Sequence, residues 1–113
     1  MALPREGQLL RIFIGESDKY QGKPLYEWIV QRARERGLAG ATVLRGIEGF
    51  GRASRIHTAK ILRLSEDLPL VIEIVDVPEK IEPFIEAVDD VIDGGLVTLE
   101  NIQVRLYRSE KEQ

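Results

Sequence analysis

The sequence predicts an α+β fold in which a four-stranded antiparallel sheet carries two helices on one face. Two observations lead to this expectation. Strand-like and helix-like segments follow each other twice in the order strand, helix, strand, at residues 9–49 and 70–107. The chain has 113 residues, which is the size of one domain. Two split βαβ units of this length close most simply into the ferredoxin-like plan, so we expect residues 1–113 to form one such domain.

The first unit begins with a short buried strand at residues 9–14, which the polar turn from Gly15 interrupts. Pro24 is well placed to open a helix and Gly37 to end it. Between them, apolar residues recur at helical spacing, namely Leu25, Trp28, Ile29 and Ala33. Residues 41–49 then form the second strand.

The second unit begins at residues 70–75, where branched side chains favour a buried strand. A helix follows Pro78, and its apolar stripe comprises Ile81, Phe84, Ile85, Val88, Val91 and Ile92. The run Asp93-Gly94-Gly95 ends this helix, and residues 96–107 form the last strand. Because both helices cover the same face of the sheet, the other face is left open. We therefore expect a homo-oligomer with cyclic symmetry.

Charge is distributed unevenly along the chain. Residues 41–64 carry five basic side chains and one acid, a net charge of +4, whereas the remaining residues carry −7. A concentrated positive segment on an acidic protein indicates a site for a small anion such as phosphate. The overall charge of −3 argues against general binding of nucleic acid.

Other classes of protein receive no support from the composition. The chain has no cysteine, which excludes disulfides and thiolate metal sites and is typical of the cytoplasm. No stretch approaches the roughly 20 apolar residues of a membrane span. His57 is the only histidine, so a histidine cluster for a metal is impossible. No pair of residues has the form of a nucleophile with its base, so we expect neither catalytic nor metal-binding residues.

Two glycine motifs are candidates for anion binding. The first is Gly49-Phe50-Gly51-Arg52, which combines freely exposed backbone amides with a guanidinium group. A flexible loop between two strands explains this motif about equally well. The second is Gly94-Gly95-Leu96-Val97, which an ordinary helix C-cap also explains. No lysine of the Walker type follows these glycines, so the second motif is no P-loop.

The chain resembles the PII signalling superfamily, and within it the group known as domain of unknown function 190. The resemblance lies in the order and spacing of Gly40-Ala41-Thr42-Val43, Glu48-Gly49-Phe50-Gly51-Arg52 and His57-Thr58, and in residues 65–73. These segments look like the second strand of that family running into its long T-loop, and like the stretch that follows the loop. The resemblance covers nearly the whole chain.

The resemblance implies a homotrimer that binds an adenine nucleotide, AMP, ADP or ATP, in clefts between subunits. It places Thr42, Gly49, Phe50, Gly51 and Arg52 on the T-loop side of the cleft. It places Gly94, Gly95, Leu96 and Val97 on the opposing turn, and Arg105 on the C-terminal strand as a phosphate ligand. No cofactor is implied. A membrane transporter or channel is the partner class that the superfamily indicates.

Three departures from the family pattern refine this expectation. Tyr107 stands where a second arginine is expected, so that Arg108 is left as its substitute. Leu96 and Val97 replace a basic residue of the opposing turn, which favours AMP or ADP over ATP. Ala53 stands where PII proteins use a glutamine for magnesium and 2-oxoglutarate. The alternatives are a metal-tolerance protein of the CutA kind, which shares the fold, and a small enzyme that uses the open sheet face.

Overall fold

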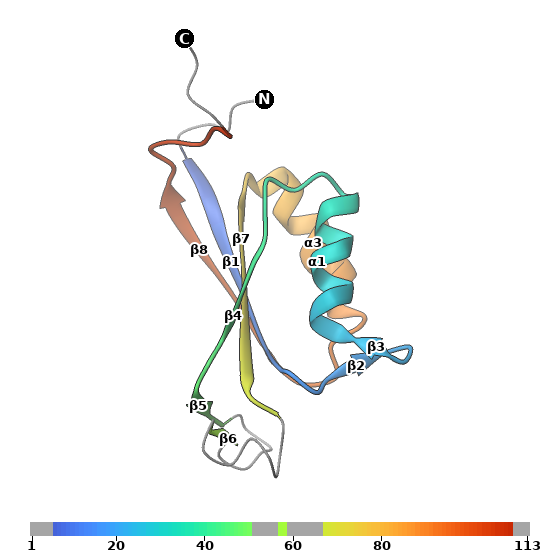
Figure 1. Cartoon of the computed structure of the whole chain (residues 1–113). Coiled ribbons are helices and arrows are strands. Elements are labelled where there is room, and N and C mark those ends of the chain that lie inside the picture. The colour runs from blue at the N-terminus through green and yellow to red at the C-terminus, as the bar shows by residue number, and fades with distance from the viewer. Residues whose placement is uncertain (1–5, 51–56, 59–66, 110–113) are drawn as a thin grey trace.

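The computed structural model describes residues 6–50, 57–58 and 67–109. Its main sheet has four antiparallel strands in the order β4-β7-β1-β8, and both long helices lie against one face of it (Figure 1). The two halves of the chain form the units β1-α1-β4 and β7-α3-β8, which confirms the ferredoxin-like double split βαβ plan. The elements are β1 (Glu6–Gly15), β2 (Lys19–Tyr20), β3 (Lys23–Pro24), α1 (Leu25–Glu35), β4 (Thr42–Arg45), β5 (Glu48–Gly49), β6 (His57–Thr58), β7 (Pro69–Asp76), α3 (Pro78–Asp89) and β8 (Leu96–Gln103).

The core lies between the sheet and the helices. Alternate residues of the central strands β1 and β7 point to the helix side and are buried, as period-two strands require. The helices meet them with residues three or four apart, Leu25, Ile29 and Ala33 from α1 and Ile81, Phe84 and Val88 from α3. Fully burying such side chains stabilises the fold by about 1.5–3 kcal/mol each. The helices are therefore held by their apolar faces.

Helix α1 begins and ends as predicted. Pro24 occupies its N-cap position, and Gly37 follows it with a φ of 74°. Helix α3 has Pro78 in its first turn and ends at Asp89, one turn before the predicted stop. The chain then turns through Val91 and Ile92, whose backbone N–H groups both donate to the Val88 carbonyl. Ile92 still packs against the core, so the apolar stripe was predicted correctly although the helix is shorter.

The predicted strand at residues 41–49 is interrupted. β4 ends at Arg45, and β5 begins only at Glu48 and pairs with β6 as a separate two-stranded sheet. Gly46, at the break, still contacts β7, since its backbone N–H donates to the Pro69 carbonyl at 2.7 Å. A Cβ atom at Gly46 would lie 2.9 Å from the ring of Pro69, so only glycine allows this close approach.

The last strand is also shorter than predicted. β8 ends at Gln103, opposite Glu6 of β1, and residues 104–108 continue as irregular chain. Arg105 and Tyr107 therefore do not alternate along a strand. No helix among the described residues is long and apolar enough to cross a membrane.

Candidate functional site

A groove lies on the open face of the sheet, between the start of β4 and the segment that follows β8. It has a volume of about 620 Å³. Two predicted site residues, Thr42 and Arg105, line it together although they are far apart in the sequence. The other lining residues are Leu9, Ala39, Gly40, Ala41, Glu73, Val75, Ile102, Gln103, Val104, Leu106 and Tyr107. The structure thus brings the T-loop side of β4 and the C-terminal segment into one concave surface.

The wall of this groove is tied to a buried carboxylate. The Tyr107 hydroxyl donates to the Ala39 carbonyl at 3.0 Å, which holds the C-terminal segment over the chain entering β4. The Ala39 N–H donates to one oxygen of Asp76 at 2.9 Å, and the Val77 N–H donates to the other at 2.7 Å. Asp76 is only 1% exposed. Because a buried carboxylate needs such donors, the backbone at Ala39 is fixed and one wall of the groove is preformed.

Charged side chains occupy the centre of the open face. The Arg11 guanidinium donates to Glu73 at 2.9 Å and to Glu100 at 3.1 Å, which joins three neighbouring strands. The hydrogen bond to Glu73 raises the pKa of Arg11 above its ordinary value, so this positive charge is fixed. Glu73 is the register partner of Thr42 and also lines the groove. Arg11 itself does not line the groove, which contains the cation of Arg105, the carboxylate of Glu73 and the hydroxyl of Thr42.

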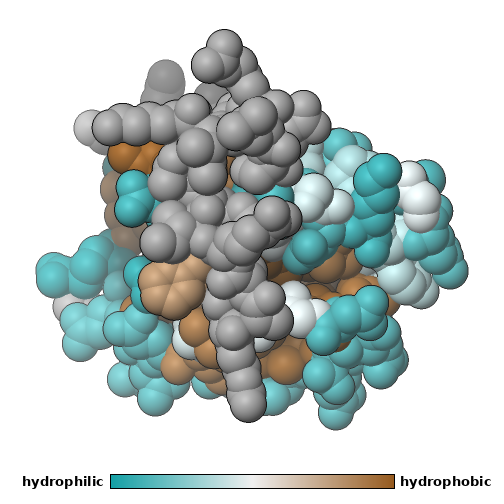
Figure 2. Space-filling model, turned by 90° about the horizontal axis from the view of Figure 1, so that it is seen from below, coloured by the Kyte–Doolittle hydropathy of each residue, from teal (hydrophilic) through white to brown (hydrophobic). Residues whose placement is uncertain are grey.

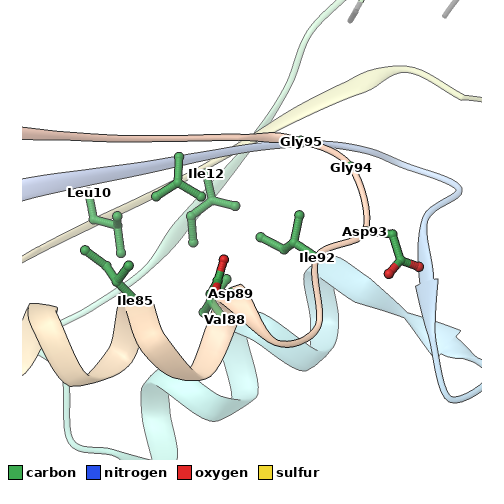
Figure 3. A pocket seen from close by; sticks show the side chains of 10 residues that line it. Leu10, Ile12, Ile85, Val88, Asp89, Ile92, Asp93, Gly94 and Gly95 are labelled. Carbon is green, nitrogen blue, oxygen red and sulfur yellow. The ribbon is translucent and has the colours of Figure 1, made fainter. Parts of the chain in front are cut away.

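The Gly94–Val97 turn lies at the far end of β8. Gly95 has a structural reason to be glycine, since a Cβ atom there would lie 2.7 Å from the Phe13 carbonyl oxygen. Gly94 has none, because its Cβ atom would meet nothing within 4 Å. Leu96 is 55% exposed and pairs with Phe13 on the open face. Gly94, Gly95 and Val97 line a second cavity, which is on the helix side of the sheet (Figure 3).

The T-loop candidates are only partly described. Gly49 lies in β5, where its missing side chain makes room for Pro69, and Phe50 is 72% exposed. Apolar surface is visible at this end of the molecule (Figure 2). Gly51 and Arg52 lie outside the described residues, so the structure places neither of them. Arg108 is described and exposed, and it does not line the groove.

Within one chain, the predicted nucleotide-binding residues lie at two opposite ends of the sheet. Leu96 and Gln103 mark the two ends of β8, and seven strand residues span roughly 24 Å. The groove with Arg105 lies beyond the Gln103 end, whereas Gly94–Val97 and the β5–β6 hairpin lie at the opposite end of the sheet (Figure 1). The described chain alone therefore does not join the two glycine motifs to Arg105.

Sequence reasoning missed several residues of the groove. Glu73 and Val75 sit at alternate positions of a strand, a pattern that indicates only which face they share. The sequence offered one signal, the glycine at position 40 directly before the residues that enter β4. Among the described residues, no group of three or more histidines and acids is arranged to hold a metal ion.

Comparison with solved structures supports the fold. The chain is similar to CPII from Thiomonas intermedia K12, described as bound to ADP and bicarbonate, with a TM-score of 0.64, 19% identity and 88% of each chain covered. It is also similar to the GlnK–ATP complex of B. subtilis, with a TM-score of 0.56, 16% identity and coverage of 89% of this chain and 85% of the other. The PII-like fold is therefore shared.

Comparison with protein sequences gives the family. A UPF0166 protein of Aquifex aeolicus is 45% identical over 97 residues, which cover 86% of this chain and 91% of that protein. A UPF0166 protein of Methanocaldococcus jannaschii is 34% identical over 106 residues, which cover 93% and 95% of the two chains. The DUF190 family model, described as "Uncharacterized ACR", matches residues 7–104. This chain, with its PII-like fold, belongs to the DUF190 family.

Proposed function

We propose that this protein is a regulatory module that binds an adenine nucleotide between two copies of the chain and signals the bound state to a partner. One observation carries the proposal. The groove with Thr42 and Arg105 opens on the uncovered face of the sheet, at a distance from the turn at Gly94. A second copy placed against this face would bring its own Gly94–Val97 turn to the groove and complete one site.

The groups in the groove suit an adenine nucleotide. Arg105 supplies charge-assisted hydrogen bonds to phosphate. Thr42 and Glu73 supply acceptors for an exocyclic amine or for ribose hydroxyls. Gly40 and Gly94 leave backbone open to a ligand, since no atom occupies the space of their missing side chains. One arginine and no basic residue in the turn favour AMP or ADP over ATP.

Relatives of the same fold give independent support for the ligand class. One CPII structure is described as bound to ADP and another as bound to ADP and AMP. GlnK is described in a complex with ATP. Because the identities are below 20%, these similarities establish the shared fold. That this chain binds the same class of ligand is our proposal. The chemistry of Arg105 and Glu73 is what makes adenine nucleotides the class to test first.

The proposed assembly is a homotrimer. The two ends of the chain present different surfaces, exposed Leu44, Ile47 and Phe50 at one end and Leu106 and Tyr107 at the other. Contact between unlike surfaces is heterologous, and such contacts close into rings with cyclic symmetry. We propose that the basic segment of residues 41–64 then docks onto a membrane transporter or channel from the cytoplasm, without turnover of the nucleotide.

Calorimetric titration with AMP, ADP and ATP, with and without magnesium, tests the ligand. Arg105→Ala should weaken binding by about 1.5–3 kcal/mol, roughly ten- to a hundredfold, because a charge-assisted contact to phosphate is lost. Arg34→Ala is the matched control, since Arg34 is an exposed arginine on α1 and lies outside the groove. Failure of all three nucleotides to bind below about 1 mM, or equal effects of the two variants, would contradict the proposed site.

A further inference from the structure

The second cavity lies between α3 and the edge strand β8, on the helix side of the sheet. It has a volume of about 360 Å³. The cavity exists because α3 packs over β1 and β7 and leaves β8 largely uncovered. Val97 and Leu99 point to the helix side beside the buried Ile12 and Leu10, yet they are 38% and 40% exposed. The edge strand is therefore left open on this side, while Ile12 and Leu10 beside it remain fully buried.

The cavity is lined by apolar side chains, by two acids and by the backbone of Gly94 and Gly95. Leu10, Ile12 and Val88 form the floor but are almost completely buried, so the accessible apolar surface comes from the walls, Ile85, Ile92 and Val97. Asp89 and Asp93 are its acidic residues. Figure 3 shows the Asp89 carboxylate pointing from α3 toward the strands, between Ile85 and Ile92, whereas the Asp93 carboxylate points away from these apolar side chains. Asp89, an exposed residue, is thus the acid whose carboxylate faces the apolar side chains.

The end of α3 makes this carboxylate a favourable place for a cation. Helix C-termini carry partial negative charge and are stabilised by basic residues. The last turn of α3 has no basic residue, and Glu86, Asp89 and Asp90 lie there instead. Asp89 makes no hydrogen bond or ion pair with any described residue. The negative potential of this end is therefore not balanced within the described part of the chain.

We propose that this cavity binds a small organic cation with an apolar body, such as a primary alkylamine, with the alkyl group against Ile85, Ile92 and Val97 and the ammonium group at Asp89. The volume is at the lower end of the range for small-ligand pockets, which are apolar with a few polar groups that fix orientation. The apolar walls favour a short alkyl chain. The Asp89 carboxylate and the C-terminal end of α3 favour an ammonium group at one end of that chain. A neutral or anionic ligand of the same shape lacks the electrostatic contact.

This site is separate from the proposed nucleotide groove. Its floor and its anchor lie on the helix side of the sheet, whereas Thr42, Glu73 and Arg105 lie at the groove on the opposite face. The groove and the cavity share no lining residue within one chain, but Gly94, Gly95 and Val97 of the cavity also form the turn that the proposed nucleotide site takes from a second copy. Amine binding is therefore measured without nucleotide, and Arg105→Ala, which lies outside the cavity, tests the nucleotide site alone.

Titration with n-hexylamine, followed by amide resonances in two-dimensional NMR, tests the proposal. The amine is protonated at pH 7, because alkylammonium groups such as that of lysine have a pKa of about 10.4. We expect saturable shifts at Gly94, Gly95 and Val97 with a dissociation constant of about 0.1–10 mM, as for a very small ligand. Hexan-1-ol should bind more weakly and hexanoate should produce no saturable shift at these amides.

Two substitutions on the same turn distinguish a specific contact with Asp89 from a general effect of negative charge. Asp89→Asn should weaken hexylamine binding by about two- to fivefold, since exposed ion pairs are weak, and should leave hexan-1-ol binding unchanged. Asp90→Asn removes the same charge from a residue that does not line the cavity and should have little effect. Equal binding of hexylamine and hexan-1-ol, equal effects of the two variants, or shifts that never saturate or that lie elsewhere would overturn the proposal.

Discussion

The two faces of the sheet are built from the same strands but have different roles. On the helix side, Leu10, Ile12, Ile72 and Ile74 are at most 1% exposed and pack against both helices. On the open side, the residues between them include Arg11 and Glu73, which are joined in an ion pair and remain about one third exposed. The helix side therefore stabilises the fold, while the open side presents charged, partly exposed side chains to a ligand or to another subunit.

This difference predicts where substitutions are costly. A side chain on the helix side has lost its contact with water completely, so its removal leaves a cavity. A side chain on the open side keeps part of its hydration, so its removal should be felt mainly in assembly or in ligand binding. The expected effects below run from the largest to the smallest.

Phe84→Ala should have the largest effect on stability. Phe84 is fully buried at the centre of the core, and truncation of such a residue costs about 3–5 kcal/mol. Urea unfolding followed by circular dichroism measures the loss. Phe50→Ala is the matched control, since Phe50 is 72% exposed and its truncation should change the free energy of unfolding by less than about 0.5 kcal/mol. Similar losses for both variants would erase the contrast between core and surface.

Asp76→Ala should have an intermediate effect. The substitution removes the acceptor of the Ala39 and Val77 N–H groups and leaves both donors without it, at a cost of about 2–3 kcal/mol in the free energy of unfolding. Asp90→Ala removes an exposed acid and should be nearly silent. Faster amide hydrogen exchange at Ala39 should accompany the loss. If Asp76→Ala had the same urea midpoint of unfolding as the unsubstituted protein, the carboxylate would not be what holds the groove wall.

Arg11→Met should have the smallest effect on unfolding, although it disrupts a three-residue ion pair network. Arg11 and its partners are partly hydrated, and such pairs contribute little to stability. Its urea midpoint should therefore shift less than that of Asp76→Ala. The raised pKa of Arg11 means that its contribution is fully present below the ordinary pKa of an arginine and is lost only at higher pH, so the midpoint should not depend on Arg11 between pH 6 and 9. A shift as large as that of Phe84→Ala would mean that the open face is packed like the core.

The sequence predicted the elements better than it predicted the site. The apolar periodicity identified β1, α1, β7 and α3, because burial on one face leaves a regular pattern in the sequence. The close approach of Gly46 to Pro69 could not be predicted, since the two residues are distant along the chain. Asp76 was missed for the same reason, because its partner Ala39 is 37 residues away. Of the predicted site residues, only Thr42 and Arg105 share the groove.

The predicted site residues that the groove leaves out lie mostly at the other end of the sheet, and a resemblance between sequences could not show this separation. Gly94 and Gly95 were singled out because two glycines exceed what a helix cap needs. The structure explains Gly95 by its contact with the Phe13 carbonyl and leaves Gly94 open to space. That contrast identifies Gly94 as the position where a substitution can block a ligand without disturbing the fold.

Complementation between two defective variants tests most directly whether one site is made by two chains. Arg105→Ala damages the groove, and Gly94→Asp places a carboxylate in open space at the opposing turn, where it should repel phosphate. Each variant alone should lose tight binding of ADP. In an equal mixture refolded together, about a quarter of the clefts should pair an intact Arg105 with an intact Gly94 and should regain the affinity of the unsubstituted protein. Loss of tight binding in both variants with no recovery in the mixture would show that each site is made by one chain.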